Sequence, residues 1–288
     1  MIKARHSHLH PLLKFCEWLL LMLAGALLIF AIWSVLPFTH ATTGALLTFQ
    51  AMQAIGVFII PALLAACLWS KQPLQWLHLT GGALRNDLTL LSIGIMVTAV
   101  PLINCLVNWN RMISLPESMQ GLEQLMQQME EQAERLLQGF LTYGNGAWWV
   151  LLVNIVVLAV LPAIGEELTF RGVLQSFFRN RHVAVWVTAF VFSFIHFQFY
   201  GFIPRLLLGA LLGYALAWSG RIGYSMIMHA TNNALSVIVF YLGTYVWHIS
   251  QDTIDAFGTG STWWLTLICT PLMLTFLYLF YKRTRVGE

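Results

Sequence analysis

The chain has 288 residues, of which 58% are hydrophobic and only 9% are charged, and its formal net charge is +3. An average soluble domain carries about 25% charged residues. This composition indicates a membrane protein, and the few scattered basic residues argue against a nucleic-acid partner. The four cysteines stand singly in apolar runs, so they form no CxxC metal or redox motif. We expect them to be small buried side chains.

Eight apolar segments are candidates to cross a bilayer, whose core of about 30 Å requires about 20 apolar residues in a helix. They lie at 13–36, 46–69, 87–107, 147–178, 183–200, 202–219, 222–246 and 262–281. Pro162 and Gly165 fall inside the fourth segment and predict a kink there. The sequence therefore predicts an all-α, polytopic membrane protein of about eight transmembrane helices, forming a single membrane-embedded domain over residues 1–288.

Lysine and arginine are concentrated in alternate loops of this eight-span topology. The basic loops carry Lys3, Arg5, Lys14, Lys71, Arg85, Arg179, Arg181, Arg221, Lys282, Arg283 and Arg285. The opposite loops carry only Arg111 and Arg135, with Arg205 close to one of them. Because basic loops stay in the cytoplasm, this pattern predicts that both termini are cytoplasmic. The first apolar run is too long for a signal-peptide core, which predicts a retained first span.

Residues 114–140 form the one long segment that we do not expect to span the membrane. Its apolar residues recur at steps of three and four, at Met119, Leu122, Met126, Met129, Ala133, Leu136 and Phe140. Gln and Glu occupy the other face, so this is predicted to be an amphipathic helix on the outer surface. Ser114 and Glu117 predict a capping box at its start. The helix rests on the spans or on lipid headgroups, or alternatively forms a lid over a substrate.

Ionisable residues inside spans are candidates for function. The fourth, fifth and seventh segments carry Glu166, Glu167, Arg171, His196 and His229, with Asn232 and Asn233 beside the last. At 1.5 Å per residue, Glu166, His196 and His229 all lie about 10–20 Å inside the cytoplasmic face. The three side chains can therefore meet at a similar depth.

Spacing along the helices predicts which of these side chains share a face. Glu167 and Arg171 are four residues apart, so we expect them to pair. Glu166 is rotated by about 100° from Glu167 and must face something else. His229 and Asn233 are also four apart. "GALLG" at 209–213 matches a close-packing GxxxG pattern. A structural role for each pair on its own is the alternative interpretation.

This set of groups is suited to hydrolysis of an acyl bond. A carboxylate in a low-dielectric cavity can act as a general base on water, and an imidazole can share the proton. A second imidazole and an amide N–H can stabilise an oxyanion. No Ser or Cys nucleophile in a GxSxG setting accompanies them. One Glu and two His can also ligate catalytic zinc, although HExxH is absent.

Three short motifs together resemble those of one family. "EELTFR" at 166–171, "FSFIH" at 192–196 and "HATNN" at 229–233 are similar to EExxxR, FxxxH and HxxxN. These are the motifs, in this order, of the CPBP family, which includes the type II CAAX prenyl endopeptidases. The resemblance covers residues of about 160–240. It implies an all-helical intramembrane endopeptidase, and with the loop charges it suggests a multi-pass protein of the bacterial inner membrane.

The resemblance also implies a role for each motif residue. Glu166 matches the water-activating glutamate, and His196 matches the histidine that works with it. His229 and Asn233 match the pair that stabilises the oxyanion. Glu167 and Arg171 match the remaining motif positions, to which we assign structural support.

The resemblance favours a mechanism without metal or other cofactor, with zinc at Glu166, His196 and His229 as the alternative. The implied partners are the lipid bilayer and a peptide or protein substrate within or at the membrane. Two other functions stay open. The first is a proton- or ion-coupled transporter, against which the lack of a second copy of the motifs counts. The second is a non-catalytic membrane protein of the bacteriocin-immunity type.

Overall fold

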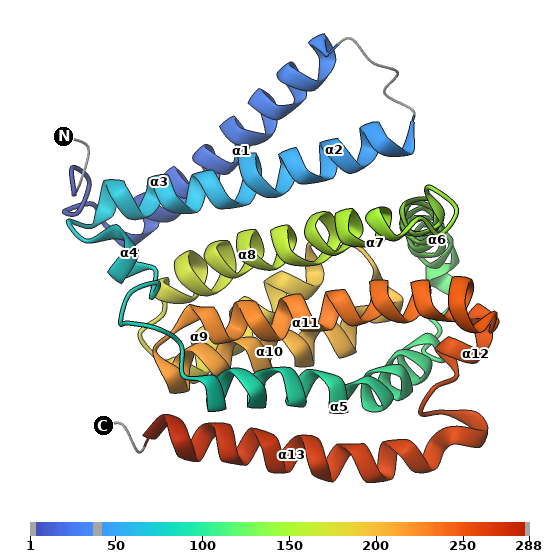
Figure 1. Cartoon of the computed structure of the whole chain (residues 1–288). Coiled ribbons are helices and arrows are strands. Elements are labelled where there is room, and N and C mark those ends of the chain that lie inside the picture. The colour runs from blue at the N-terminus through green and yellow to red at the C-terminus, as the bar shows by residue number, and fades with distance from the viewer. Residues whose placement is uncertain (1–3, 37–41, 286–288) are drawn as a thin grey trace.

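The computed structural model describes residues 4–36 and 42–285, and every regular element in these ranges is helical (Figure 1). Seven helices in the described residues are long and apolar enough to cross a membrane. They are Pro11–Val35, Thr43–Trp69, Asn86–Arg111, Trp148–Phe177, Phe199–Ser219, Ile222–Trp247 and Thr253–Arg285. The prediction of an all-α polytopic membrane protein is confirmed.

Several of these long helices are composites of α-helical, π-helical and 3-10 stretches. The α-helices are α1 Pro11–Val35, α2 Thr43–Gln53, α3 Ile60–Trp69, α4 Pro73–Trp76, α5 Asn86–Arg111, α6 Gln120–Thr142, α7 Trp148–Asn154, α8 Leu161–Glu167, α9 Arg181–Phe194, α10 Phe202–Ser219, α11 Ile222–Tyr241, α12 Gln251–Asp255 and α13 Trp263–Arg285. The π-helical segments are Ala54–Ile59, Ile155–Val160, Leu168–Val173 and Leu242–Trp247. The 3-10 segments are Glu117–Met119, Leu174–Phe177, Phe199–Gly201 and Gly260–Thr262.

The predicted fifth span, 183–200, is wrong as a full span. Its helix α9 has only 14 residues, about 21 Å at 1.5 Å per residue, whereas α5 has 26 residues and is about 39 Å long. The helix ends at Phe194 because the following residues form a turn, in which Phe197 adopts a left-handed φ of 54°. The chain then returns through α10, which packs on α9. Since α9 and α10 form one hairpin, the alternation of the loops is unchanged.

The predicted basic loops lie together at one end of the bundle. Arg221 donates to the carbonyls of Gly81 and Gly82, and Arg85 donates to the Arg283 carbonyl at 3.1 Å. The start of α1, α4 and the end of α13 lie at this same end (Figure 1). Lys3 of the predicted basic set lies outside the described residues. The grouping of the basic loops is thus confirmed, whereas their cytoplasmic location stays a prediction.

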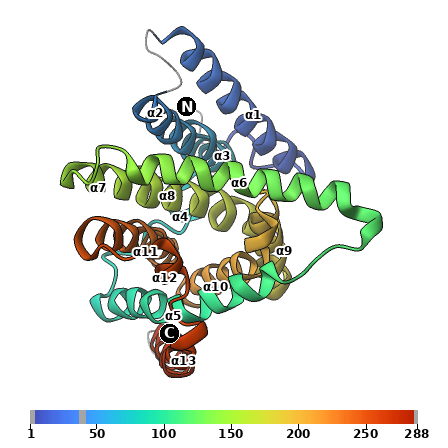
Figure 2. The same ribbon diagram turned by 90° about the vertical axis from the view of Figure 1, so that its right-hand side faces the viewer.

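Helix α6 lies at the opposite end of the bundle and runs across the ends of the other helices (Figure 2). Its side chains are mostly exposed, and Phe140 alone among them is buried. The amphipathic helix is confirmed, but it covers Gln120–Thr142 rather than 114–140. The predicted capping box is wrong, because Pro116 initiates a 3-10 turn first and the α-helix then begins after Met119 without a side-chain cap.

The disruption expected at Pro162 takes the form of a π-helical segment, Ile155–Val160, immediately before it. The same arrangement occurs at Ala54–Ile59, just before Pro61. Proline offers no N–H to the preceding turn, and π-helical bulges are one way in which a helix absorbs such a break. Gly165 then packs against the segment Ala54–Ile59, since a Cβ at Gly165 would lie 3.0 Å from the Ala54 carbonyl oxygen.

The cysteines are free, and the expectation that all would be buried is wrong. Cys16 and Cys105 are exposed on the helix surface. The reason is that the outer helices direct apolar side chains outward. Only 6% of the residues in the apolar 18-residue stretch of α1 are buried, and Leu20 is 64% exposed. In a membrane this surface contacts lipid, so an apolar side chain such as cysteine can lie on the surface of the protein without contacting water.

Candidate active site

Glu167 lies at the centre of a buried network of hydrogen bonds. Its Oε1 accepts from Arg171 Nη1 at 2.9 Å and lies 2.8 Å from His229 Nδ1. Its Oε2 accepts from the Ser225 hydroxyl. The side chains of Glu167 and Arg171 are both fully buried. The predicted Glu167–Arg171 pair is therefore confirmed, and Glu167 also joins the fourth predicted span to α11.

Ser225 was not identified from the sequence. It lies four residues before His229 on α11, so both side chains share one helix face. That spacing is a signal that sequence analysis could have used. A serine hydroxyl is common in helices of every kind, however, and its partner is on another helix.

Arg171 also connects the network to the α9–α10 hairpin. Its Nη2 donates to the Gly209 carbonyl at 2.9 Å, and its guanidinium lies 4.6 Å from the centre of the Phe192 ring. Gly209 packs closely on α9, since a Cβ there would lie 3.2 Å from the Ala189 Cα. Four residues later, the Gly213 carbonyl accepts from a buried glutamine of the fourth span at 3.2 Å. The predicted close packing at 209–213 is confirmed.

Glu166 is held differently from its neighbour. Its side chain is 17% exposed, and its Oε2 lies 3.7 Å from His229 Nε2. No hydrogen bond to its carboxylate occurs within residues 4–36 and 42–285. Of the two adjacent carboxylates, Glu167 is thus fully bonded and Glu166 is left available.

His229 faces both glutamates through its two ring nitrogens. Nδ1 bonds to Glu167, and Nε2 points toward Glu166. An ionised Glu167 only accepts hydrogen bonds, so His229 carries its proton on Nδ1 in the neutral state. Nε2 is then free to receive a proton on the side of Glu166.

His196 lies in the turn after α9 rather than inside a span. Its Nδ1 donates to the Phe192 carbonyl at 2.6 Å, which leaves Nε2 as the nitrogen available to a ligand. The Phe192 ring packs edge-on against His196 at 4.9 Å and against His229 at 5.7 Å. Within the described residues, no hydrogen bond or ion pair joins His196 to Glu166. The structure thus places His229, rather than His196, next to the available glutamate.

Asn233 lies one turn beyond His229 on α11. Its side-chain oxygen accepts from Asn232 Nδ2 at 3.2 Å. Its own amide N–H groups have no protein partner in the part of the chain that the structure describes. The amide can therefore donate to a ligand.

The zinc alternative requires Glu166, His196 and His229 to converge on one point. In the described residues, no group of three His, Cys, Asp or Glu side chains is arranged to hold a metal ion.

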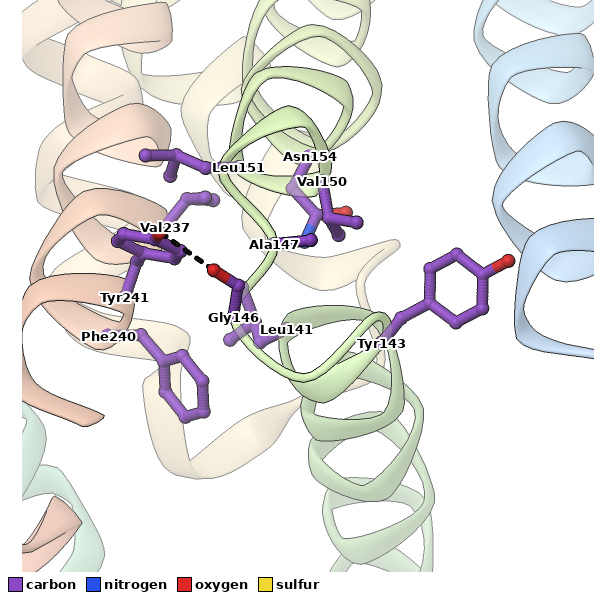
Figure 3. A pocket seen from close by; sticks show the side chains of 10 residues that line it. All are labelled: Leu141, Tyr143, Gly146, Ala147, Val150, Leu151, Asn154, Val237, Phe240 and Tyr241. Atoms are coloured by element: carbon purple, nitrogen blue, oxygen red, sulfur yellow. Dashed lines mark hydrogen bonds between the residues drawn. The ribbon is translucent and has the colours of Figure 1, made fainter. Parts of the chain in front are cut away.

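Two cavities lie away from the glutamates. One, of about 210 Å³, lies between α6, the end of α5 and the segment around Phe199–Ile203. The other, of about 10 Å³, is bordered by α7, α11 and the end of α6, where Tyr241 donates to the Gly146 carbonyl (Figure 3). The second has room for about one water, and neither cavity is lined by a predicted site residue.

Fold and site together define a polytopic helical membrane protein with a buried centre of carboxylates and imidazoles. The family model for type II CAAX prenyl endopeptidase Rce1-like proteins matches residues 147–235, a stretch that includes Glu166, His196, His229 and Asn233. The resemblance inferred from the three motifs is thereby confirmed over this stretch, which is less than half of the chain.

A curated relative matches over a stretch of similar length. The uncharacterized protein YpbD of Bacillus subtilis (strain 168) is 30% identical over 106 residues, which is 35% of this chain and 51% of the relative. The chain thus spans about half of the length of the relative. No solved structure matches the chain.

Proposed function

We propose that the protein is an intramembrane endopeptidase that uses a glutamate-activated water to hydrolyse a peptide bond of a membrane-associated peptide or protein. The match to the Rce1-like endopeptidases supports the reaction class. The different bonding of two adjacent glutamates supports the identity of the base.

That bonding is the observation that carries the proposal. Glu167 is buried and bonded to Arg171, Ser225 and His229. Glu166, by contrast, is partly exposed, and in the described residues the one basic nitrogen within 4.0 Å of its carboxylate is His229 Nε2, at 3.7 Å. A carboxylate that is not committed to protein donors can accept a proton from water, so Glu166 is the base and Glu167 is structural.

In the proposed reaction, Glu166 takes a proton from water while the water oxygen attacks the peptide carbonyl carbon. Asn233 donates an N–H to the oxyanion, and His229 donates a second hydrogen bond from Nε2–H in its doubly protonated form, keeping both ring protons throughout the reaction. His196 shares the proton taken from water through its free Nε2. The proton finally passes to the nitrogen of the leaving peptide as the C–N bond breaks, so the charges balance.

The test compares Glu166→Gln with Glu167→Gln in the purified, detergent-solubilised protein. Peptidase rate and melting temperature are measured for each. Glu166→Gln should lower kcat by about 10²–10⁴-fold with little change in melting temperature, because it removes a general base and keeps the shape. Glu167→Gln should act mainly by lowering the melting temperature. Glu131→Gln, at a 65% exposed position on α6, is the matched control.

A rate for Glu166→Gln that stays near wild type would show that another group is the base. Metal analysis and a chelator address the zinc alternative in the same preparations. We expect activity to persist in the chelator. Stoichiometric zinc whose removal abolishes activity would instead make Glu166, His196 and His229 metal ligands.

A further inference from the structure

His196 is carried by a short irregular turn between α9 and α10. Phe197, the next residue, adopts a left-handed φ of 54°, which is uncommon for a bulky side chain. Residues held in sparsely populated conformations persist where their surroundings fix them. The direction of the His196 ring therefore depends on whatever holds residues 195–201 in place.

Arg205, the fourth residue of α10, reaches back to this segment. Its Nη1 donates to the Gln198 carbonyl at 3.0 Å, and its Nη2 donates to Gln198 Oε1 at 3.1 Å. Both the backbone and the side chain of Gln198 are thus held by one planar group. Gly201 gives the guanidinium room, since a Cβ there would lie 3.1 Å from Arg205 Nη2.

A second clamp comes from α5. Asn110 is buried, its Nδ2 donates to the Phe199 carbonyl at 2.9 Å, and its Oδ1 accepts from the Ile203 N–H at 3.0 Å. This clamp holds the far side of the turn. The near side, next to His196, is held by Arg205 together with the turn's own bond from the Phe197 N–H to the Phe194 carbonyl, at 3.1 Å.

The charge of Arg205 is not used in an ion pair. No carboxylate oxygen lies within 4.0 Å of its guanidinium in the described residues. Its electrostatic neighbours are Glu130 of α6, and then Glu166 and His196. The contacts of Arg205 in this structure are thus directional hydrogen bonds to the turn beside the site.

We propose that Arg205 is a positioning residue that orients His196 by gripping Gln198 at two points. The inference rests on the proposed function, in which His196 shares the proton taken from water. The guanidinium is a rigid fork whose donors match two acceptors at once, whereas an ammonium is a single point charge. The shape of the group, and not only its charge, is what the turn requires.

The experiment uses three variants of the full chain. Arg205→Lys keeps the charge and removes the fork, and we expect kcat to fall by about 10²-fold, the typical effect of a displacement of about 1 Å. The KM should stay within about threefold, because an effect confined to the chemical step leaves substrate binding unchanged. Gln198→Leu removes one acceptor and should lower kcat in the same way. Gln198→Glu keeps an acceptor and should retain most of the activity.

Arg135→Lys on α6 is the matched control, because its side chain is 70% exposed and should not affect the turn. A second readout does not require proteolysis: hydrogen exchange of the backbone amides at 195–201. Exchange should accelerate in Arg205→Lys and Gln198→Leu, and stay at the wild-type rate in Gln198→Glu and Arg135→Lys. This readout distinguishes the two proposals, because a wild type without peptidase activity refutes the proposed function while the exchange still tests the clamp.

Two results would overturn the positioning role. One is wild-type exchange and wild-type kcat in both Arg205→Lys and Gln198→Leu. The other is a loss of melting temperature with unchanged kcat per folded molecule, which is what a merely structural contact predicts. If Arg205→Lys does not fold, the two Gln198 variants decide, because both retain Arg205.

Discussion

At the scale of single residues, Glu167 and Arg171 form a pair whose members depend on each other. Both side chains are fully buried, and Arg171 also donates to the Gly209 carbonyl. Taking charges out of water is costly, so a buried ion is tolerated only while its partner compensates it. Removing one member therefore costs far more than the net contribution of the pair.

Arg171→Ala should destabilise the protein by about 3–5 kcal/mol, because it leaves the Glu167 carboxylate buried without its cation. The measurement is the free energy of unfolding in mixed micelles, followed as a function of denaturant. The double variant Glu167→Leu/Arg171→Met should recover part of that loss, since the buried charges are removed but Ser225 and His229 lose their acceptor. A fully stable Arg171→Ala would refute the pairing as a stabilising element.

The sequence predicted the members of this site better than their bonds. Glu167 and Arg171 lie four apart on one helix, so their contact follows from local geometry. The bond between His229 and Glu167 joins two helices, and it depends on how each helix is rotated about its axis. No spacing within α11 reveals that rotation, which is why the sequence predicted neither the bond between His229 and Glu167 nor the one between Ser225 and Glu167.

At the scale of elements, one of the contacts that hold α1 on the bundle is made where two glycines meet. A Cβ at Gly25 would overlap the carbonyl oxygen of Gly56, in the π-helical segment Ala54–Ile59. The close approach of the two backbones therefore requires glycine at this position. α1 is also held near its start, where Trp18 is buried and Glu17 accepts from Trp69 Nε1 at 2.8 Å, whereas most of its other side chains are exposed.

Gly25→Ala should displace α1 and lower the melting temperature, because backbone atoms must shift to admit one methyl group. Gly139→Ala on α6 is the opposite case, with nothing within 4 Å of the added carbon. It should stabilise the protein by about 1 kcal/mol, the usual gain of alanine over glycine in a helix interior. Equal melting temperatures for Gly25→Ala and wild type would contradict this account of α1.

Helix α6 carries a half-buried carboxyl group, Glu130, whose negative charge at neutral pH opposes the docking of the helix on the bundle. Burial raises the pKa of the Glu130 carboxyl above its ordinary value of 4.5. Arg205 and Arg111 lower that pKa, and the neighbouring Glu134 raises it. The docked helix therefore binds the proton more tightly than an undocked helix does. Docking is strongest below pH 4.5 and weakens as pH rises from there through the raised pKa.

Glu130→Gln should remove this pH dependence and slow the hydrogen exchange of α6 amides at neutral pH. The measurement is exchange at pH values of about 4 to 8, corrected for the intrinsic rate, with Glu131→Gln as the exposed control. An unchanged pH dependence in Glu130→Gln would show that another group controls the docking.

The elements themselves were largely predictable, with one instructive exception. Long apolar runs indicate helices whatever their tertiary contacts, so seven spans and the amphipathic helix follow from composition and periodicity. The end of α9 does not, because the predicted span 183–200 contains neither glycine nor proline, and the helix nevertheless ends at Phe194. Its turn is instead held by Asn110 and Arg205, which belong to other helices.

At the scale of the whole molecule, the basic loops and α6 lie at opposite ends of the bundle (Figures 1 and 2). We predict that the basic end is cytoplasmic and that residues of about 108–146 lie outside. A reporter that is active only outside the cytoplasm, inserted after Gln128, should be active. The control insertion after Lys71 should be inactive, and the reverse pattern would refute this orientation.

The α9–α10 hairpin also bears on the order in which the protein is assembled in the membrane. A helix of 14 residues is too short to cross a bilayer alone. The turn between α9 and α10 has backbone N–H and C=O groups for which lipid offers no hydrogen-bond partner. One of those groups, the Phe199 carbonyl, bonds to Asn110 of α5, which is synthesised earlier. We therefore expect α9 and α10 to leave the insertion machinery as a unit, and only after α5 is in place to receive them.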